Sequence, residues 1–298
     1  MKRLTIYMLV FVVSGLFIAS CSSEEELEPS YKDEIYFFVP EDATDDESVL
    51  RRDFYKETGI HLLFNDTLHT EYIGVDGFGD KVYDVEKVDL NYMQTSILKD
   101  PIRLEYFQYM DDKQAAVEFV KEHILSHLSG SLRPYSFLLV PSIEMYDDYY
   151  EEWNYQDIIK GWHCTAISLE GIGEMDEEEK NELKTTCLYS IVKDVINKME
   201  YFREFYSYSD PYYGMYKEDL DIPEEYDDEQ ARQFGFLKDY RDYYYIYSDD
   251  DLEYFIQETV STTEEEFTEL YGEYPLIMGK YNTLKKRMES IGYVFNRQ

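Results

Sequence analysis

Residues 135–140 read YSFLLV, and residues 164–169 read CTAISL. Neither run contains a charged residue, and both are rich in apolar side chains. A short continuous apolar run is typical of a strand that is buried on both faces. The two runs therefore predict two core strands, and the segments around them indicate the kind of fold to which the strands belong.

Upstream of these runs, strand and helix patterns alternate. Residues 34–39 (EIYFFV) are rich in β-forming side chains and are followed by Pro40. Residues 45–58 have helical periodicity with Gly59 as a stop, and residues 60–64 begin another strand. A strand, a helix and a strand in this order predict a βαβ-like opening to a mixed sheet. Further strands are predicted at 82–92 and 102–110, a candidate hairpin, and residues 144–157 are a Tyr-, Asp- and Glu-rich excursion between the core strands.

Helical patterns dominate the second half of the chain. Asp111 and Asp112 precede apolar residues at helical spacing, and Gly130 follows them, which predicts a capped amphipathic helix. A longer helix is expected from Asp176 to about Phe205, with an irregular surface loop at 207–227 after it. More helices are predicted at 228–234, 250–260, 263–270 (with Thr263 and Glu266 as a capping box) and 275–291. Together these elements predict an α+β fold, with a mixed β-sheet in the N-terminal half and a helical C-terminal half, as one domain over residues 34–298.

Charge and composition exclude some classes of protein. The 298 residues carry a formal net charge of −36, and such a chain repels phosphate backbones, so nucleic-acid binding is not expected. Hydrophobic residues make up 44% and aromatic residues 17%, which is enough apolar material for a sizeable core. The sequence therefore indicates a folded acidic protein.

The N-terminus has the features of a lipoprotein signal. Lys2 and Arg3 precede an apolar stretch at 4–18, which is short for a membrane span of roughly 20 residues. The residues at 18–21 (IASC) resemble a bacterial lipobox, so residues 1–20 are expected to be removed and Cys21 to carry the lipid. Residues 21–33 are then a polar tether. Its SSEEE start resembles the acidic export tag of surface lipoproteins in the Bacteroidota, which favours an outer-membrane lipoprotein exposed on the cell surface over one on the periplasmic face.

The remaining cysteines and two histidines are candidate sites. Cys164 and Cys187 could form a disulfide in this compartment, but their apolar neighbours favour two buried free thiols. His123 and His127 have the spacing of a zinc pair, yet residue 124 is Ile and no third ligand is near, so a solvent-facing pair is favoured over a metal site.

Other catalytic signatures are missing. The sequence contains no nucleophile elbow, phosphate-binding loop or EF-hand spacing, and acid clusters such as residues 249–251 are better explained as solvated faces. A glycosidase acid pair cannot be recognised from sequence, because it depends on carboxylate separation in space. The 32 tyrosines could capture a glycan or a peptide, although half-buried packing explains them more simply.

Several segments together resemble a known family, the zinc-binding metallopeptidases of Bacteroidota, also called substrate import-associated zinc metallohydrolase lipoproteins. Residues 223–226 (PEEY) and 229–236 (EQARQFGF), followed by Tyr240, resemble that family's "P-x-x-Y" and "E-A-R-x-x-G-F-x-x-x-Y" region. Residues 250–261 resemble its acidic helix, and residues 274–277 (YPLI) with Lys280 and Leu284 resemble its closing helix. The two core strands and the lipobox agree with the family as well. The resemblance implies a zincin-like domain covering most of residues 34–293.

The resemblance also implies where the zinc site should lie. The family's H-E-x-x-H motif belongs on the long helix after the second core strand, and here Val192 and Ile196 replace the histidines while Lys193 replaces the glutamate. Glu253 or Glu258 on the acidic helix remains as the equivalent of a third ligand. A single carboxylate cannot hold a catalytic zinc ion, which needs three protein ligands. No cofactor is therefore expected. Instead, a buried Lys193 paired with Glu253 or Glu258 could replace the charge of the metal.

These features lead to one hypothesis about function and two rivals. The first is a non-catalytic, surface-anchored lipoprotein with a degenerate zincin-like fold, an accessory or binding component of an outer-membrane nutrient-import complex with a peptide or glycan ligand. The second is an active hydrolase whose zinc or acid-pair site is assembled elsewhere. The third is a surface glycan-binding protein that uses the Tyr-rich loops.

Overall fold

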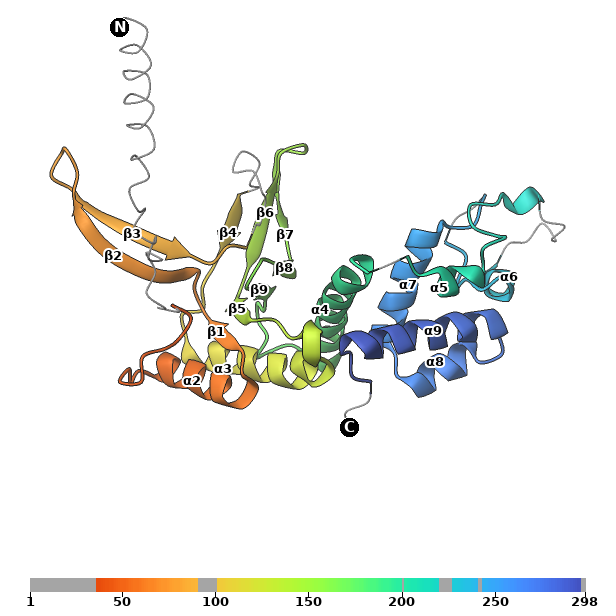
Figure 1. Cartoon of the computed structure of the whole chain (residues 1–298), viewed down its shortest axis with the longest axis horizontal. Helices are drawn as coiled ribbons and strands as arrows, with labels where there is room; N and C mark the ends of the chain where they lie inside the picture. Colours follow the sequence, from red (N-terminus) through yellow and green to blue (C-terminus); the bar gives the residue numbers. More distant parts are fainter. Residues whose placement is uncertain (1–35, 91–100, 200, 220–226, 241–242, 296–298) are drawn as a thin grey trace, which may run out of the picture. The chain divides into compact units, whose positions relative to one another are not determined.

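The two core strands lie side by side in a four-stranded sheet (Figure 1). β5 (Ser136–Val140) pairs in parallel with β9 (Thr165–Ser168), and β1 (His61–Leu63) is parallel to β5 on its other side. β8 (Ile158–Lys160) closes the opposite edge, antiparallel to β9. Both core strands are therefore confirmed in a mixed sheet. The computed structural model describes residues 36–90, 101–199, 201–219, 227–240 and 243–295.

The two faces of this sheet belong to different hydrophobic clusters. Phe137 and Leu139 pack with apolar side chains of the helices, whereas Leu138 and Val140 pack with residues such as Ile143 in a second cluster. Every residue of β5 is buried. The strand therefore contributes side chains to two hydrophobic clusters, one on each face, which explains its continuous apolar sequence. Full burial of each large apolar side chain stabilises the fold by about 1.5–3 kcal/mol.

Residues 144–157 form strands that the sequence pattern did not reveal. β6 (Ile143–Asp147) and β7 (Glu152–Tyr155) are antiparallel neighbours, and β4 (Ile102–Leu104) pairs with the other side of β6. Apart from Ile143, β6 and β7 are half-buried or exposed. The strong alternation that marks a one-sided strand is consequently absent from this stretch.

The hairpin expected between 82–92 and 102–110 is wrong. β3 (Lys81–Lys87) pairs instead with β2 (Thr67–Val75), and the turn between them is held by Asp76, whose carboxylate accepts the backbone N–H groups of Phe78 and Asp80. Both strands are largely exposed, so no buried face marked the register in the sequence.

The strand expected at 34–39 is also absent from the part that the structure describes, residues 36–39, which form a turn and a bend. Phe37 and Phe38 instead place their rings 5.6 and 4.6 Å from the ring of His61. Their apolar character serves side-chain packing rather than a strand ladder. The signal peptide, Cys21 and the tether lie outside the described residues.

The N-terminal helices agree with expectation except at one cap. α2 (Asp46–Thr58) starts at Asp45, whose carboxylate accepts from Ser48 N, and ends at Gly59 in the left-handed region. α3 (Met110–Phe119) continues through a π-helical turn (Val120–Ile124) and a 3-10 turn (Leu125–His127). Its N-cap is Tyr109, which makes no side-chain cap, and Asp111 lies in the first helical turn. The expected acidic cap is therefore wrong.

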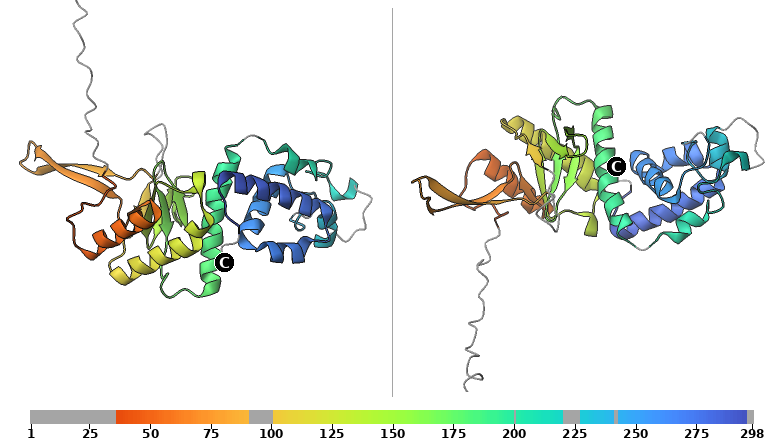
Figure 2. Two further views of the ribbon diagram at one scale, coloured as in Figure 1. Left: turned by 60° about the horizontal axis from the view of Figure 1, so that its bottom comes forward. Right: turned by 90° about the horizontal axis from the view of Figure 1, so that it is seen from above.

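The long helix α4 (Glu177–Asn197) lies between the sheet and the C-terminal helices (Figures 1 and 2) and contacts β8, α7 and α9. It begins in a capping box of Asp176 and Glu179 and ends at Asn197, short of the expected Phe205. The segment after it holds α5 (Arg203–Ser207) and a 3-10 turn at Lys217–Asp219 within the predicted loop. None of the helices in the described ranges is long and apolar enough to cross a bilayer. The predicted C-terminal helices are present as α6 (Asp228–Gln233), α7 (Ser248–Ser261), α8 (Glu264–Tyr271) and α9 (Pro275–Ile291).

Both remaining cysteines are buried free thiols, as favoured from their neighbours. Cys164 belongs to the cluster under Leu138, whereas Cys187 of α4 belongs to the cluster of the helices. Burial raises the pKa of Cys164 to about 12, so this thiol stays protonated at neutral pH.

The two acidic helix starts offer a matched test of capping. Asp176→Ala removes a carboxylate that accepts two backbone N–H groups, and we expect a loss of about 1 kcal/mol in the free energy of unfolding, measured by urea denaturation. Asp111→Ala is the control, since Asp111 caps nothing, and should change stability by less than about 0.5 kcal/mol. Equal losses in the two variants would contradict this assignment.

Candidate functional site

The long helix and the acidic helix pack against each other at the positions that the sequence singled out. Lys193 of α4 lies 2.7 Å from Glu253 Oε1 of α7, and the Tyr189 hydroxyl donates to Glu253 Oε2 at 3.1 Å. The ammonium also lies 5.3 Å from the centre of the Tyr189 ring. One glutamate of α7 is thus held by two side chains that are one turn apart on α4.

The two positions that correspond to the family's histidines are apolar and buried. Val192 is fully buried and Ile196 is 4% exposed, and both belong to the main hydrophobic cluster together with Leu252 of α7. Neither side chain can bind a metal. The face of α4 that would hold zinc therefore contributes packing and one ion pair.

The hypothesis that the Lys193 ammonium replaces the charge of the metal requires a buried lysine. The side chain of Lys193 is, however, 29% exposed, and that of Glu253 is 38% exposed. Partial burial lowers the pKa of Lys193, but the hydrogen bonds to Glu253 and Tyr189 outweigh it and leave the pKa raised. Lys193 is therefore charged at neutral pH. The contribution of the pair to stability should be small, because solvent screens ion pairs at this exposure.

Glu258 does not join this pair. Its carboxylate accepts a hydrogen bond from the Tyr271 hydroxyl of α8 at 2.9 Å, and burial together with Glu258 raises the pKa of that tyrosine. Of the two glutamates considered as third-ligand equivalents, the structure brings only Glu253 to Lys193.

A pocket of about 400 Å³ adjoins the Lys193–Glu253 pair. It lies where the end of α4, the segment leading into α5 and the first half of α7 meet. Its lining combines aromatic rings with carboxylates and consists of Ile196, Asn197, Met199, Tyr201, Phe202, Tyr206, Asp249, Leu252 and Glu253. Such a mixture suits a ligand that has apolar surface as well as hydrogen-bond donors.

The two histidines of the alternative zinc site lie in different turns, His123 in the π-helical turn and His127 in the 3-10 turn that follows it. His123 stacks on Phe119, whereas His127 stacks on Tyr293 and has Nδ1 3.1 Å from the carbonyl oxygen of Val294. Both are half-buried rather than solvent-facing. Burial lowers the pKa of His127. Among the residues that the structure describes, no group of three or more His, Cys, Asp or Glu side chains could hold a metal ion.

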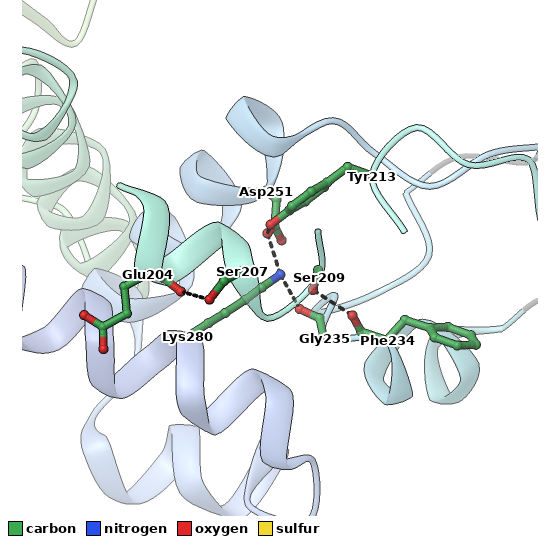
Figure 3. Close-up of polar contacts among 8 residues, drawn as sticks. All are labelled: Glu204, Ser207, Ser209, Tyr213, Phe234, Gly235, Asp251 and Lys280. Atoms are coloured by element: carbon green, nitrogen blue, oxygen red, sulfur yellow. Dashed lines mark hydrogen bonds and ion pairs between the residues drawn. The ribbon is translucent and has the colours of Figure 1, made fainter. Parts of the chain in front are cut away.

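The helix that carries Glu253, α7, also takes part in a buried ionic cluster (Figure 3). Lys280 of α9 is fully buried and donates to Asp251 Oδ2 at 2.6 Å and to the Gly235 carbonyl at 2.8 Å. The Tyr213 hydroxyl donates to the same Asp251 oxygen at 2.7 Å. The ammonium lies 4.9 Å from the centre of the Phe236 ring. Burial raises the pKa of Asp251 and lowers that of Lys280, and each charge opposes the shift of the other.

Asp251 corrects the interpretation of residues 249–251 as a solvated face, because it is 1% exposed. Asp251 lies on the buried side of α7 together with Leu252 and Phe255. In the sequence this position is marked only by an acid that interrupts an apolar pattern. Gly235 has a φ of +88°, and a Cβ there would lie 2.5 Å from Ser209 Oγ, so the bend that presents its carbonyl to Lys280 requires glycine.

The residues that carry the family resemblance meet in this cluster. Gly235, Phe236 and Lys280 belong to the quoted motifs, and Asp251 lies in the acidic helix. Residues 223–226 lie outside the described ranges. Gly235, Phe236 and Lys280 therefore have a packing role around the buried ion pair.

The tyrosine-rich runs are divided between the surface and the core. Tyr149 and Tyr150 at the β6–β7 turn are exposed, whereas Tyr245 is buried and stacks on Phe236. The packing interpretation therefore holds for Tyr245, whereas the capture of a glycan or peptide by the exposed tyrosines stays a prediction.

Comparison with family models, with curated proteins and with solved structures gave no match. The class that fold and site define is an α+β protein, with mixed sheets over residues 61–168 and a mostly helical part over 177–291.

The two lysines provide a contrast that measures what each ion pair contributes. Lys280→Met leaves the Asp251 carboxylate buried without its partner, and we expect the free energy of unfolding to fall by about 3–5 kcal/mol. Lys193→Met removes an exposed pair and should cost only about 0.2–1 kcal/mol. Urea denaturation followed by circular dichroism measures both.

The double variant Lys280→Met with Asp251→Leu is the control for this test. Because it removes both charges, it should recover much of the stability lost in Lys280→Met. A Lys280→Met variant as stable as Lys193→Met would refute the buried pair.

Proposed function

We propose that this protein is a surface-anchored lipoprotein and a non-catalytic relative of zinc metallopeptidases, which acts as a binding or accessory component of outer-membrane nutrient uptake. The observation that carries the proposal is the contact between Lys193 and Glu253. The family resemblance assigns one of these residues to the metal-binding helix and the other to the acidic helix. Their contact in space supports the alignment of both helices with that family.

The order of the elements along the chain supports the same alignment with that family. α4 directly follows the core strand β9 in the chain, as the family's metal-binding helix follows its second core strand. With Val192 and Ile196 buried in the core and Lys193 at the glutamate position, a zincin-like scaffold here would lack the two histidine ligands and the base that activates water. The scaffold would then serve to bind rather than to cleave.

The pocket beside Glu253 supports a binding role. Tyr201 is 69% exposed at its edge, and Phe202 and Tyr206 line it with two carboxylates nearby. Aromatic faces next to hydrogen-bond acceptors suit a peptide or a sugar ring. An import complex would use such a site to retain nutrient fragments at the cell surface. The association with import rests on the resemblance alone.

Metal content tests the loss of catalysis. The purified chain should contain well under one zinc ion per molecule by elemental mass spectrometry after dialysis against metal-free buffer, and His123→Ala with His127→Ala should not change this value. One firmly bound zinc per chain would overturn the proposal and make the two histidines the first suspects.

Restoring the motif tests the scaffold. The triple variant Val192→His, Lys193→Glu, Ile196→His should gain about one zinc per chain, because Glu253 can then act as a third ligand. Adding Glu253→Gln should abolish that gain, while Glu258→Gln should not. A folded triple variant that binds no zinc would separate this helix pair from a metalloprotease site.

The lipid anchor is tested at Cys21. Cells that express the protein should incorporate labelled palmitate into it, and Cys21→Ser should lose the label and release the protein from the membrane fraction. Protease added to intact cells should degrade the anchored form if it is displayed on the surface. Protection from protease would place it on the periplasmic face.

A further inference from the structure

A second pocket, of about 700 Å³, lies at the other end of the α4–α7 pair. Lys193 near the C-terminal end of α4 meets Glu253 in the first half of α7, whereas Lys184 in the first half of α4 lines a pocket together with Thr259 near the end of α7. The two helices are therefore antiparallel. This second pocket shares no lining residue with the first.

One residue that lines this pocket, Thr259, has a hydroxyl without a hydrogen-bond partner among the described residues. Thr259 is 2% exposed, and its hydroxyl makes no hydrogen bond within the described part of the chain. A buried hydroxyl without a partner costs free energy, so native structures rarely leave one unsatisfied. Thr259 is one of the residues that line the pocket, and a ligand that reaches its hydroxyl could satisfy it.

The pocket also holds a cation that lacks a direct partner. Lys184 is half-buried, and in the described ranges its ammonium makes no hydrogen bond or ion pair, although acids greatly outnumber lysines in the chain. Burial lowers its pKa, and only the more distant charge of Glu266 opposes this effect. A carboxylate placed at Lys184 would supply the missing contact.

The acids around the pocket are already engaged, with one exception. Glu264 is paired with Lys285 at 2.6 Å, and Glu266 accepts the backbone N–H and the hydroxyl of Thr263. Glu265 makes no hydrogen bond or ion pair among the described residues and can accept hydrogen bonds from a ligand. Tyr293 and Phe295 add aromatic walls, and His127 adds a ring nitrogen.

We propose that this pocket binds a small carboxylate that also presents hydrogen-bond donors, either the hydroxyls of a sugar acid or the ammonium of an amino acid. Lys184 binds the carboxylate, Thr259 donates a hydrogen bond to the ligand, and Glu265 accepts from the donor groups. The aromatic walls pack against the carbon skeleton. This site is independent of the Lys193–Glu253 face and of any relation to metallopeptidases.

Calorimetric titration of the purified chain with galacturonate, galactose and glutamate tests the proposal. Galacturonate and galactose differ only at C6, which is a carboxylate in the first and a hydroxymethyl group in the second. Galacturonate or glutamate should therefore bind, and galactose should bind at least about tenfold more weakly. Binding of galacturonate alone identifies a sugar acid, and binding of glutamate alone identifies an amino acid. Equal affinity for galactose and galacturonate, or no binding of either acid, would overturn the proposal.

Variants locate the binding in this pocket. Lys184→Met should weaken the acid by at least about tenfold, and Thr259→Val should weaken it while leaving the preference for the carboxylate. Lys180→Met is the matched control, since Lys180 lies one turn earlier on α4, pairs with Glu177 and does not line the pocket. Circular dichroism checks that each variant is folded. Acid binding that survives Lys184→Met unchanged would refute the assignment.

Discussion

The burial of α4 on more than one side is the constraint on which the rest of the structure depends. Its six buried residues, from Leu183 to Ile196, all belong to the main hydrophobic cluster, and the helix touches β8 as well as α7 and α9. The sheet and the C-terminal helices thus share one core through this helix. Because protein interiors are close-packed, a polar group can enter this core only with a complete set of partners. Val192 and Ile196 meet this condition because they are apolar.

The acidic character of the chain makes it harder for a buried carboxylate to find the partners that it needs. With 64 acids against 28 basic residues, a buried carboxylate must compete for few cations. Asp251 obtains one from Lys280 and also accepts a hydrogen bond from the Tyr213 hydroxyl, and the Gly235 carbonyl accepts a second hydrogen bond from the ammonium. A buried pair of this kind adds little net stability compared with an apolar pair, but breaking it is costly. It therefore fixes how α9, α7 and the bend at Gly235 meet.

Sequence patterns predicted the parts of the fold in which burial follows a simple period. The apolar runs of β5 and β9, the start of α4 after Asp176, the capping box of α8 and the Gly59 stop of α2 were all recognisable. The strands β2, β6 and β7 were missed because they are partly exposed and lack a one-sided apolar face. The end of α4 at Asn197 was missed because apolar residues continue to Phe205 at a spacing that also fits the separate helix α5.

The candidate site was predictable in its residues but not in its environment. The contact of Lys193 with Glu253 followed from placing two segments on facing helices, whereas the exposure of the pair depends on tertiary packing that no spacing reveals. Asp251 and Lys280 show the reverse case: the acid looked like part of a solvated run, and only the fold turns it toward the core. Thr259 and Lys184 gave no sequence signal, since a threonine and a lysine on helices are common and become notable only when a pocket leaves them without partners.

The chemistry available to the Lys193–Glu253 pair differs from that of a metal centre. An ammonium supplies one positive charge and three hydrogen-bond donors, but it has no open coordination position and cannot lower the pKa of a bound water as zinc does. Its side chain is 29% exposed, so solvent screens its charge and it offers little preorganised electrostatic stabilisation of a transition state. What remains is a charged edge beside an aromatic pocket. Under the proposed function, that arrangement orients a ligand beside the Lys193–Glu253 pair.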